Sequence, residues 1–384
     1  DVCSSDLDVD GAVRVTKGFA WALAGKAYLF AEKYDQAKTA LKKVIDSGKY
    51  ALVPGERYMD NFHIEGDGNE EKVFEINFEY NAGKDGWSGM IQRSSWMEAN
   101  AWNWRAGNFV KNPANVYCGG VDGWGGLGVP QWFGDEFLAN DGHSYRFDAT
   151  LKHIDDAVYG MEYQDPTLNA MTREEKMVSD KVGISDPTQG LYGNSFWLAF
   201  KQIMRGPDTG GKAYGDNIRL NNYIIMRYAE VLLNYAEACI QTGDAATAKT
   251  YINMIQERAG SNTISASVDM NVLKKEKSYE LWLEGCRWFD ILRWNDAEGI
   301  ARLKAVGSDV PHLFDKMFRQ PKSDDRKVTW ENGTEANSRF YTVSSSEAKD
   351  KGFKVGFQQG KHELFPFPQT VIDKNPNLVQ NPGW

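Results

Sequence analysis

Residues 19–45 read FAWALAGKAYLFAEKYDQAKTALKKVI. Apolar residues recur at steps of three and four in both halves of this stretch, a spacing typical of amphipathic α-helices. A polar break falls between the halves at Glu32 and Lys33, and Gly48 supplies a stop after the second half. We therefore predict two antiparallel helices within residues 13–48. The side chains expected to face the core are Phe19, Leu23, Ala27 and Phe30 in the first helix and Ala37, Leu41, Val44 and Ile45 in the second.

The pattern of this hairpin is that of a tetratricopeptide repeat, in which small residues allow paired helices to approach closely. A second hairpin with the same pattern is predicted, with helices at residues 223–241 and 245–259. Repeats of a free solenoid follow one another directly, so the segment at residues 51–215 must form a structure of its own. The residues that fit the repeat pattern are Trp21, Ala24, Gly25 and Tyr28 in the first hairpin and Ala236, Gly243, Ala248 and Ile252 in the second.

The predicted fold class is mostly α-helical with little β structure. We expect a single domain over residues 1–384, in which the tetratricopeptide-like hairpins form a curved α-α superhelix and a long loop-rich insertion sits on it. One strand is predicted at residues 72–78, where side chains on the two faces differ in polarity. The parts are the hairpin at 13–48, the insertion at 51–215 with the presumed ligand site, the hairpin and following helix at 216–300, and an irregular C-terminal region at 301–384 that ends in a Pro-rich strap.

The charge and motif content disfavours several classes of function. With 44 Lys and Arg against 53 Asp and Glu, the net charge is -9, and nucleic-acid binding requires a basic patch that this balance does not favour. The four cysteines lie far apart without a zinc-ligand spacing, and no apolar stretch of ~20 residues is present. No HExxH, GxSxG or phosphate-loop motif occurs. We expect no catalysis, no cofactor, no metal and no nucleic-acid partner.

Tryptophan is concentrated in one Gly- and Asn-rich stretch. Six of the 13 Trp fall within residues 87–132, where the sequence has neither helical nor strand periodicity. Sugar binding requires flat apolar faces for pyranose rings and polar groups for their hydroxyls. Both are interleaved here, so the stretch predicts a glycan site; the alternative is that these Trp pack the loops onto the repeats. The candidate ligand-binding residues are Trp96, Trp102, Trp104, Trp124, Trp132, Asn103 and Arg105.

A helix expected at residues 272–294 carries charges that resemble a catalytic cluster. Two pairs of opposite charge stand three residues apart, which brings the members of each pair together on the helix surface. We interpret them as structural ion pairs. The pairs are Glu284 with Arg287 and Asp290 with Arg293. The Trp residues at helical spacing, which are expected to serve helix packing, are Trp21, Trp282, Trp288 and Trp294.

Four segments, in order along the chain, resemble one known family. Residues 280–294, ELWLEGCRWFDILRW, are similar to the helix that SusD/RagB proteins carry near their carboxy terminus. Residues 364–384, which include LFPFP and NPNLVQNPGW, are similar to the closing motif of that family. Two further segments resemble the same family, RYAEVLL at residues 227–233 and RVTKG at residues 14–18. The chain is identified as a member of the SusD/RagB family, which implies a SusD-like helical fold.

The resemblance also implies a function. SusD/RagB proteins are surface lipoproteins that bind a glycan and deliver it to a SusC-like TonB-dependent transporter. The implied location is the exposed face of the outer membrane, with a lipid anchor that would precede residue 14, so the chain is expected to be truncated at its amino end. Two alternatives stay open: a peptide-binding importer subunit of the same family, and a helical glycoside hydrolase, because its two carboxylates need no fixed spacing in sequence.

Overall fold

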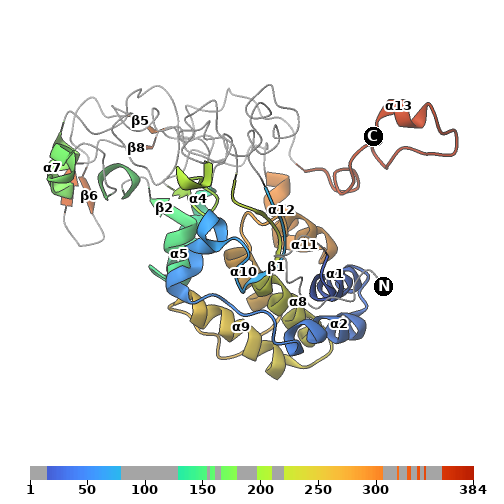
Figure 1. The fold of residues 1–384 in the computed structure, drawn as a ribbon. Helices are drawn as coiled ribbons and strands as arrows, with labels where there is room; N and C mark the ends of the chain where they lie inside the picture. Colours follow the sequence, from blue (N-terminus) through green and yellow to red (C-terminus); the bar gives the residue numbers. More distant parts are fainter. Residues whose placement is uncertain are drawn as a thin grey trace.

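The computed structural model describes residues 15–78, 129–153, 156–160, 166–179, 197–209, 220–305, 318–319, 327–329, 335–337, 341–342 and 357–384. Most of the regular structure is helical, which confirms the predicted fold class (Figure 1). The helices are α1 (Lys17–Phe30), α2 (Tyr34–Asp46), α4 (Gln131–Asp141), α5 (Tyr145–Thr150), α6 (Pro166–Asn169), α7 (Arg173–Val178), α8 (Tyr228–Gln241), α9 (Ala245–Ala259), α10 (Met270–Glu280), α11 (Arg287–Arg293), α12 (Ala297–Ala305) and α13 (Gln369–Ile372). None of the helices within the described ranges is long and apolar enough to cross a membrane.

Among the described residues, the strands form small antiparallel pairs. The antiparallel pairs are β1 (Lys72–Ile76) with β4 (Tyr223–Arg227), β2 (Leu151–His153) with β3 (Trp197–Ala199), β5 (Phe318–Arg319) with β8 (Tyr341–Thr342), and β6 (Lys327–Thr329) with β7 (Glu335–Asn337). The short turns are η1 (Gly55–Phe62), η2 (Ile64–Gly66), η5 (Asp156–Gly160) and η6 (Pro207–Thr209).

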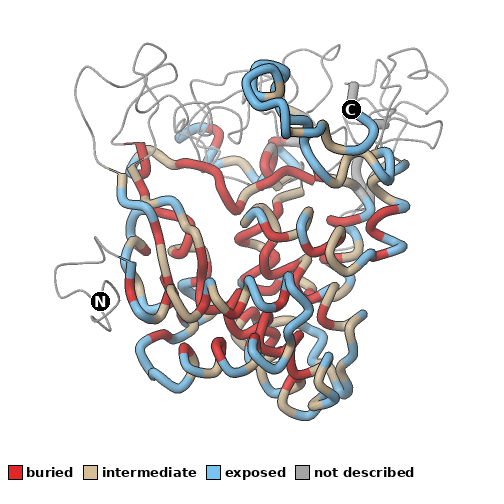
Figure 2. Tube along the Cα trace, turned by 90° about the vertical axis from the view of Figure 1, so that its right-hand side faces the viewer, coloured by how far each residue is buried: buried red, intermediate tan, exposed pale blue. Residues whose placement is uncertain are grey.

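Two helical hairpins, α1–α2 and α8–α9, lie side by side in the lower half of Figure 1, with α2 packed on α8. Thr16 caps α1, since its hydroxyl oxygen accepts a hydrogen bond from the Phe19 N–H at 3.1 Å. Asp244 caps α9 through the Thr247 N–H at 3.2 Å. One hydrophobic core contains side chains from all four helices, so the two predicted hairpins pack as neighbours although the insertion separates them in sequence. Figure 2 shows buried residues running through this helical body.

The buried face of α1 differs from the predicted one. Leu23 is 50% exposed, Phe30 is 43% exposed and Ala27 is also exposed, so the expectation that these three residues face the core is wrong. The face that contacts α2 carries smaller side chains, because the two helices approach closely there. A Cβ atom on Gly25 would lie only 2.4 Å from Leu41 Cγ. The buried residues of α1 are Phe19, Ala22, Gly25 and Leu29.

The start of the second hairpin also differs from the prediction. Residues 223–227 form β4, and α8 begins only at Tyr228, so the helix predicted from residue 223 is five residues too long at its start. The physical reason is a partner strand: β4 pairs with β1 in antiparallel register, with Glu75 opposite Ile224. The Tyr228 N–H then donates to the Glu71 carbonyl at 2.8 Å and ends the pairing.

The single helix predicted at residues 272–294 is two helices. Between α10 and α11 the chain turns at Leu283, with φ of 62°, and at Gly285, with φ of 75°. Left-handed backbone at two nearby positions ends a right-handed helix. Gly285 meets this requirement without strain, whereas Leu283 does not. The break changes the direction of the charged side chains that follow α10.

A second hydrophobic core joins the insertion to α10. Phe133 and Phe137 of α4 pack with Trp197 of β3 and with Tyr279 of α10. Gly134 permits this packing, because a Cβ atom there would lie 2.2 Å from the Trp197 indole. The Trp197 indole N–H also donates to Asp135 Oδ1 at 2.8 Å. These contacts hold the start of α4 against α10.

The C-terminal segment at residues 357–384 has an extended form with one short helix, α13, that follows Pro368. No residue of this segment is buried, and in Figure 1 it projects from the helical body. Its end folds back on itself, because the Trp384 indole N–H donates to the carbonyls of Lys361 and Leu364, each at 3.0 Å.

Candidate functional site

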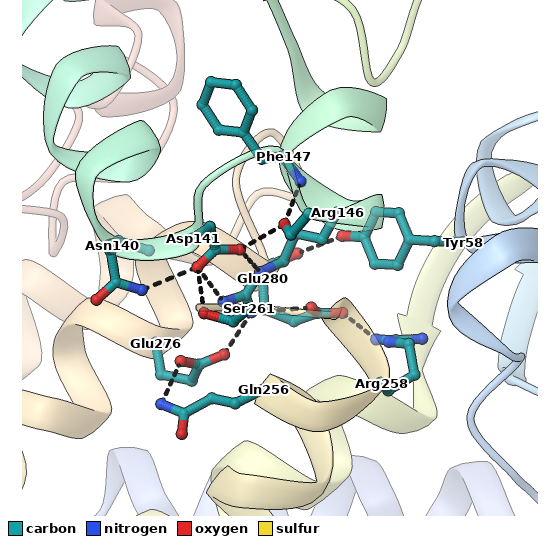
Figure 3. Close-up of polar contacts among 12 residues, drawn as sticks. Tyr58, Asn140, Asp141, Arg146, Phe147, Gln256, Arg258, Ser261, Glu276 and Glu280 are labelled. Carbon is teal, nitrogen blue, oxygen red and sulfur yellow. Dashed lines mark hydrogen bonds and ion pairs between the residues drawn. The ribbon is translucent and has the colours of Figure 1, made fainter. Parts of the chain in front are cut away.

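A cluster of buried ionic side chains joins the insertion to the helical hairpins. Each of its side chains is no more than 8% exposed. Figure 3 shows Asp141, Arg146, Glu276 and Glu280 converging between the insertion and the helices. The members of this buried charge cluster are Glu71, Asp141, Arg146, Lys201, Arg227, Arg258, Glu276, Glu280 and Glu284.

Two arginines organise the buried charge cluster. Arg146 forms a two-pronged contact with Asp141, at 2.9 Å and 3.0 Å, and its third nitrogen pairs with Glu276. Arg227 donates to Glu280 at 3.0 Å and to Glu284 at 2.6 Å, and it also pairs with Glu71. Burial raises the pKa of Glu280, but the surrounding guanidinium groups outweigh it and lower that pKa to about 2.

These contacts show why the charged residues of the family-like segment are structural. Glu284 lies 2.7 Å from the Lys201 ammonium and contacts Arg227, so the predicted pair with Arg287 is wrong. The helix break before α11 points Glu284 toward the insertion instead. The other predicted pair is present, with Asp290 and Arg293 2.7 Å apart.

A second buried pair, His63 with Asp208, links η1 and η2 to η6. Burial raises the pKa of Asp208, but hydrogen bonds from His63 at 2.7 Å and from the Ile64 N–H at 2.9 Å help to lower it to about 2. A carboxyl whose pKa is depressed in the folded state stabilises that state above its unfolded pKa of 3.8, and this stabilisation is lost as the pH falls toward 2.

We expect the Asp208→Asn variant to reveal this linkage. Near pH 6 it should unfold with a free energy about 2 kcal/mol lower than the native protein, and the difference should shrink as the pH falls from 5 to 2, because protonated Asp208 resembles Asn. Urea denaturation of both proteins across this range measures the difference. A difference that stays constant over the whole range would contradict the assignment.

An open groove of about 570 Å³ lies between α4, α10, α11 and α12. Its walls combine aromatic and charged side chains. The aromatic residues are Trp132, Phe133, Tyr279 and Trp282, and the charged residues are Glu136, Lys274, Lys275, Arg287, Asp296, Glu298 and Arg302. We call this surface the Trp132 groove.

Among the described residues of the groove, Trp132 is the exposed aromatic one. Pro130 precedes α4 and the helix begins at residue 131, so Trp132 lies in its first turn. Its side chain is 42% exposed. The Arg302 guanidinium covers one face of the indole at 3.5 Å from the ring centroid, and Glu298 holds that guanidinium at 2.6 Å. A flat ligand can therefore stack on the rest of the indole or take the place of Arg302.

The geometry does not test whether the residues predicted from the sequence bind a ligand. Trp132 lines the groove as described, beside Trp282, which was expected to serve packing alone and which stacks on Phe133 at 5.6 Å. The basic residues of α10 and α12 were missed, because nothing local in the sequence relates them to α4. The other candidates, Trp96, Trp102, Trp104, Trp124, Asn103 and Arg105, lie outside the described residues.

A metal site was not expected from the sequence. Among the residues that the structure describes, no group of three or more His, Cys, Asp or Glu side chains is placed to hold a metal ion.

The sequence of this chain matches the model of one known protein family. The model of the SusD family matches residues 70–384. The chain belongs to the SusD family. This agrees with the resemblance of the C-terminal segments and with the helical hairpins of the fold.

Several relatives of the SusD family are similar to this chain. A SusD-like protein of Bacteroides ovatus is 35% identical over 194 residues, which cover 47% of this chain and 33% of that protein. The structure of surface glycan-binding protein A from Bacteroides fluxus has a TM-score of 0.65 at 20% identity and matches 100% of this chain and 66% of that one. Surface glycan-binding protein A from Bacteroides thetaiotaomicron, in complex with laminarihexaose, has a TM-score of 0.58 at 20% identity. The match covers 99% of this chain and 66% of that one. The chain thus spans a third of the curated relative and about two thirds of the solved ones.

Proposed function

We propose that this chain belongs to a cell-surface protein that captures oligosaccharides by equilibrium binding, without a covalent step. The observation that carries the proposal is membership of the SusD family, whose solved relatives include surface glycan-binding proteins. The Trp132 groove supports it, because its volume falls within the ~300–1,000 Å³ typical of ligand sites. Aromatic faces would contact the CH surfaces of sugar rings, and the charged side chains would bond their hydroxyls.

The proposal includes a partner and a location. The bound glycan would pass to a SusC-like TonB-dependent transporter in the outer membrane, and a lipid anchor would hold the protein at the cell surface. Affinity purification of the tagged full-length protein from outer membranes tests this. Recovery of a TonB-dependent transporter is the expected result, and its absence from purifications that retain the lipid-anchored protein would argue against the partner.

An array of plant, host and microbial glycans, read beside an array of peptides, tests the substrate class. We expect binding to at least one glycan family. If peptides bind and no glycan does, the substrate assignment is wrong and the peptide-binding alternative replaces it.

Replacing Trp132 with alanine is expected to weaken glycan binding about 2- to 12-fold, because one stacking partner of ~0.5–1.5 kcal/mol is lost. Phe289→Ala is the matched control, since Phe289 is 53% exposed on α11 and does not line the groove. Calorimetric titration with a glycan identified on the array measures both affinities. If Trp132→Ala binds the glycan as tightly as the native protein does, the glycan site does not include Trp132.

A further inference from the structure

The charges of the Trp132 groove do not cancel. Among the described residues, four basic and three acidic side chains line it, which leaves one positive charge in excess. Each of the three carboxylates is already paired with a basic side chain of the same groove. The pairs are Lys274 with Asp296 at 2.8 Å, Lys275 with Glu136 at 2.9 Å, and Arg302 with Glu298 at 2.6 Å. The basic residue left over is Arg287.

Arg287 has no carboxylate within ion-pair distance in the described part of the chain. One of its N–H groups donates to the Lys274 carbonyl oxygen at 3.1 Å, which holds the side chain in place. A neutral carbonyl does not balance the positive charge of the guanidinium. Burial lowers the pKa of Arg287, and the more distant Asp296 and Asp290 do not offset this effect. An anion bound in the groove would therefore stabilise the charged form of this partly buried guanidinium.

Arg293, on the same short helix, shows the opposite arrangement. Its guanidinium donates to both carboxylate oxygens of Glu237, one of them at 2.6 Å, and to Asp290. The neighbouring carboxylates raise its pKa despite burial. Both guanidinium groups are partly removed from water, but among the described residues only Arg293 has a carboxylate within ion-pair distance. The groove supplies open space beside the other.

We propose that the Trp132 groove selects saccharides that carry a carboxylate, that is, uronic acid residues, with Arg287 binding the carboxylate while the groove's aromatic side chains contact the sugar rings. This inference rests on the proposed glycan binding and names its substrate class. A guanidinium fork matches the two oxygens of a carboxylate, and one carboxylate bound at Arg287 balances the excess in the groove. A neutral sugar would leave that excess unmatched.

Calorimetric titration with matched pairs of trisaccharides tests the inference on the native protein. The probes are trimers of galacturonate, glucuronate and mannuronate, each beside its methyl ester, which differs in lacking the charge. In at least one pair the acid should bind about 10- to 100-fold more tightly than the ester, the range expected for a hydrogen bond to a charged group. The preference should shrink as the salt concentration rises. If the ester binds as tightly as the acid in every pair, or if no acid binds, the inference is overturned.

The Arg287→Gln variant tests whether Arg287 causes the preference for the acid over its methyl ester. It should bind the acid and the ester with similar affinity, while Arg287→Lys should retain part of the preference because it keeps the charge without the fork. Lys42→Gln is the control, since it removes the same charge from an exposed position on α2. A preference that survives in Arg287→Gln would overturn the role of this residue. If only neutral glycans bind, the proposed preference for uronic acids is wrong and the proposed glycan binding still holds. If no saccharide binds, both proposals are wrong.

Discussion

Replacing Arg227 with methionine is expected to lower the free energy of unfolding by about 3–5 kcal/mol, because it leaves buried carboxylates without their partner. The Arg227 side chain is 0% exposed, and it contacts Glu71, Glu280 and Glu284. Glu71 directly precedes β1, Glu280 ends α10 and Glu284 lies in the turn after it, so the loss would loosen the insertion from the helices. Urea denaturation followed by circular dichroism measures the change. A variant that cannot be recovered in folded form agrees with the upper end of this range.

Arg57→Met is the matched control for this experiment. Arg57 is 48% exposed and pairs with Asp60 at 3.0 Å, so its removal should change the free energy of unfolding by less than about 1 kcal/mol. If Arg227→Met proves as stable as Arg57→Met, the buried charge cluster does not hold the insertion in place.

Replacing Gly25 with valine should lower the free energy of unfolding by about 3 kcal/mol, at the upper end of the usual effect of overpacking. A Cβ atom there would lie 2.4 Å and 2.6 Å from two carbons of Leu41, so α1 and α2 must separate to admit a side chain. The better helix propensity of valine relative to glycine offsets only a small part of this loss.

Ala27→Val on the same helix is the control, because Ala27 is exposed and the new methyl groups would meet solvent. Its free energy of unfolding should fall by no more than about 0.7 kcal/mol. Equal stability of the two variants, compared by thermal and urea denaturation, would show that the close contact of α1 with α2 does not depend on Gly25.

Features that depend on neighbouring residues could be predicted from the sequence. The bounds of α9 agree with the prediction at both ends, because Asp244 caps its start and Gly260 adopts a left-handed conformation at its end. The start of α8 could not be predicted in the same way. β4 exists because β1, far away in sequence, lies beside it, and the local pattern of residues 223–227 does not contain that information.

Fewer residues of the candidate groove could be predicted, for the same reason. Trp132 was singled out because tryptophan in a Gly-rich stretch stands out locally, and its role in ligand binding stays a prediction. Arg287 and Arg302 were not singled out for the groove, since they reach it from α11 and α12 only after the chain folds. The partners of Glu284 were also missed, because Lys201 belongs to the insertion and the break at Leu283 and Gly285 redirects the side chain.

Titration of the protein with a panel of oligosaccharides by calorimetry, with the same mixtures then assayed for new reducing ends, tests glycan capture most directly. We predict saturable binding of at least one oligosaccharide and no increase in reducing ends. Failure of every oligosaccharide to bind would contradict glycan capture, and a rise in reducing ends would show instead that the protein hydrolyses its ligand.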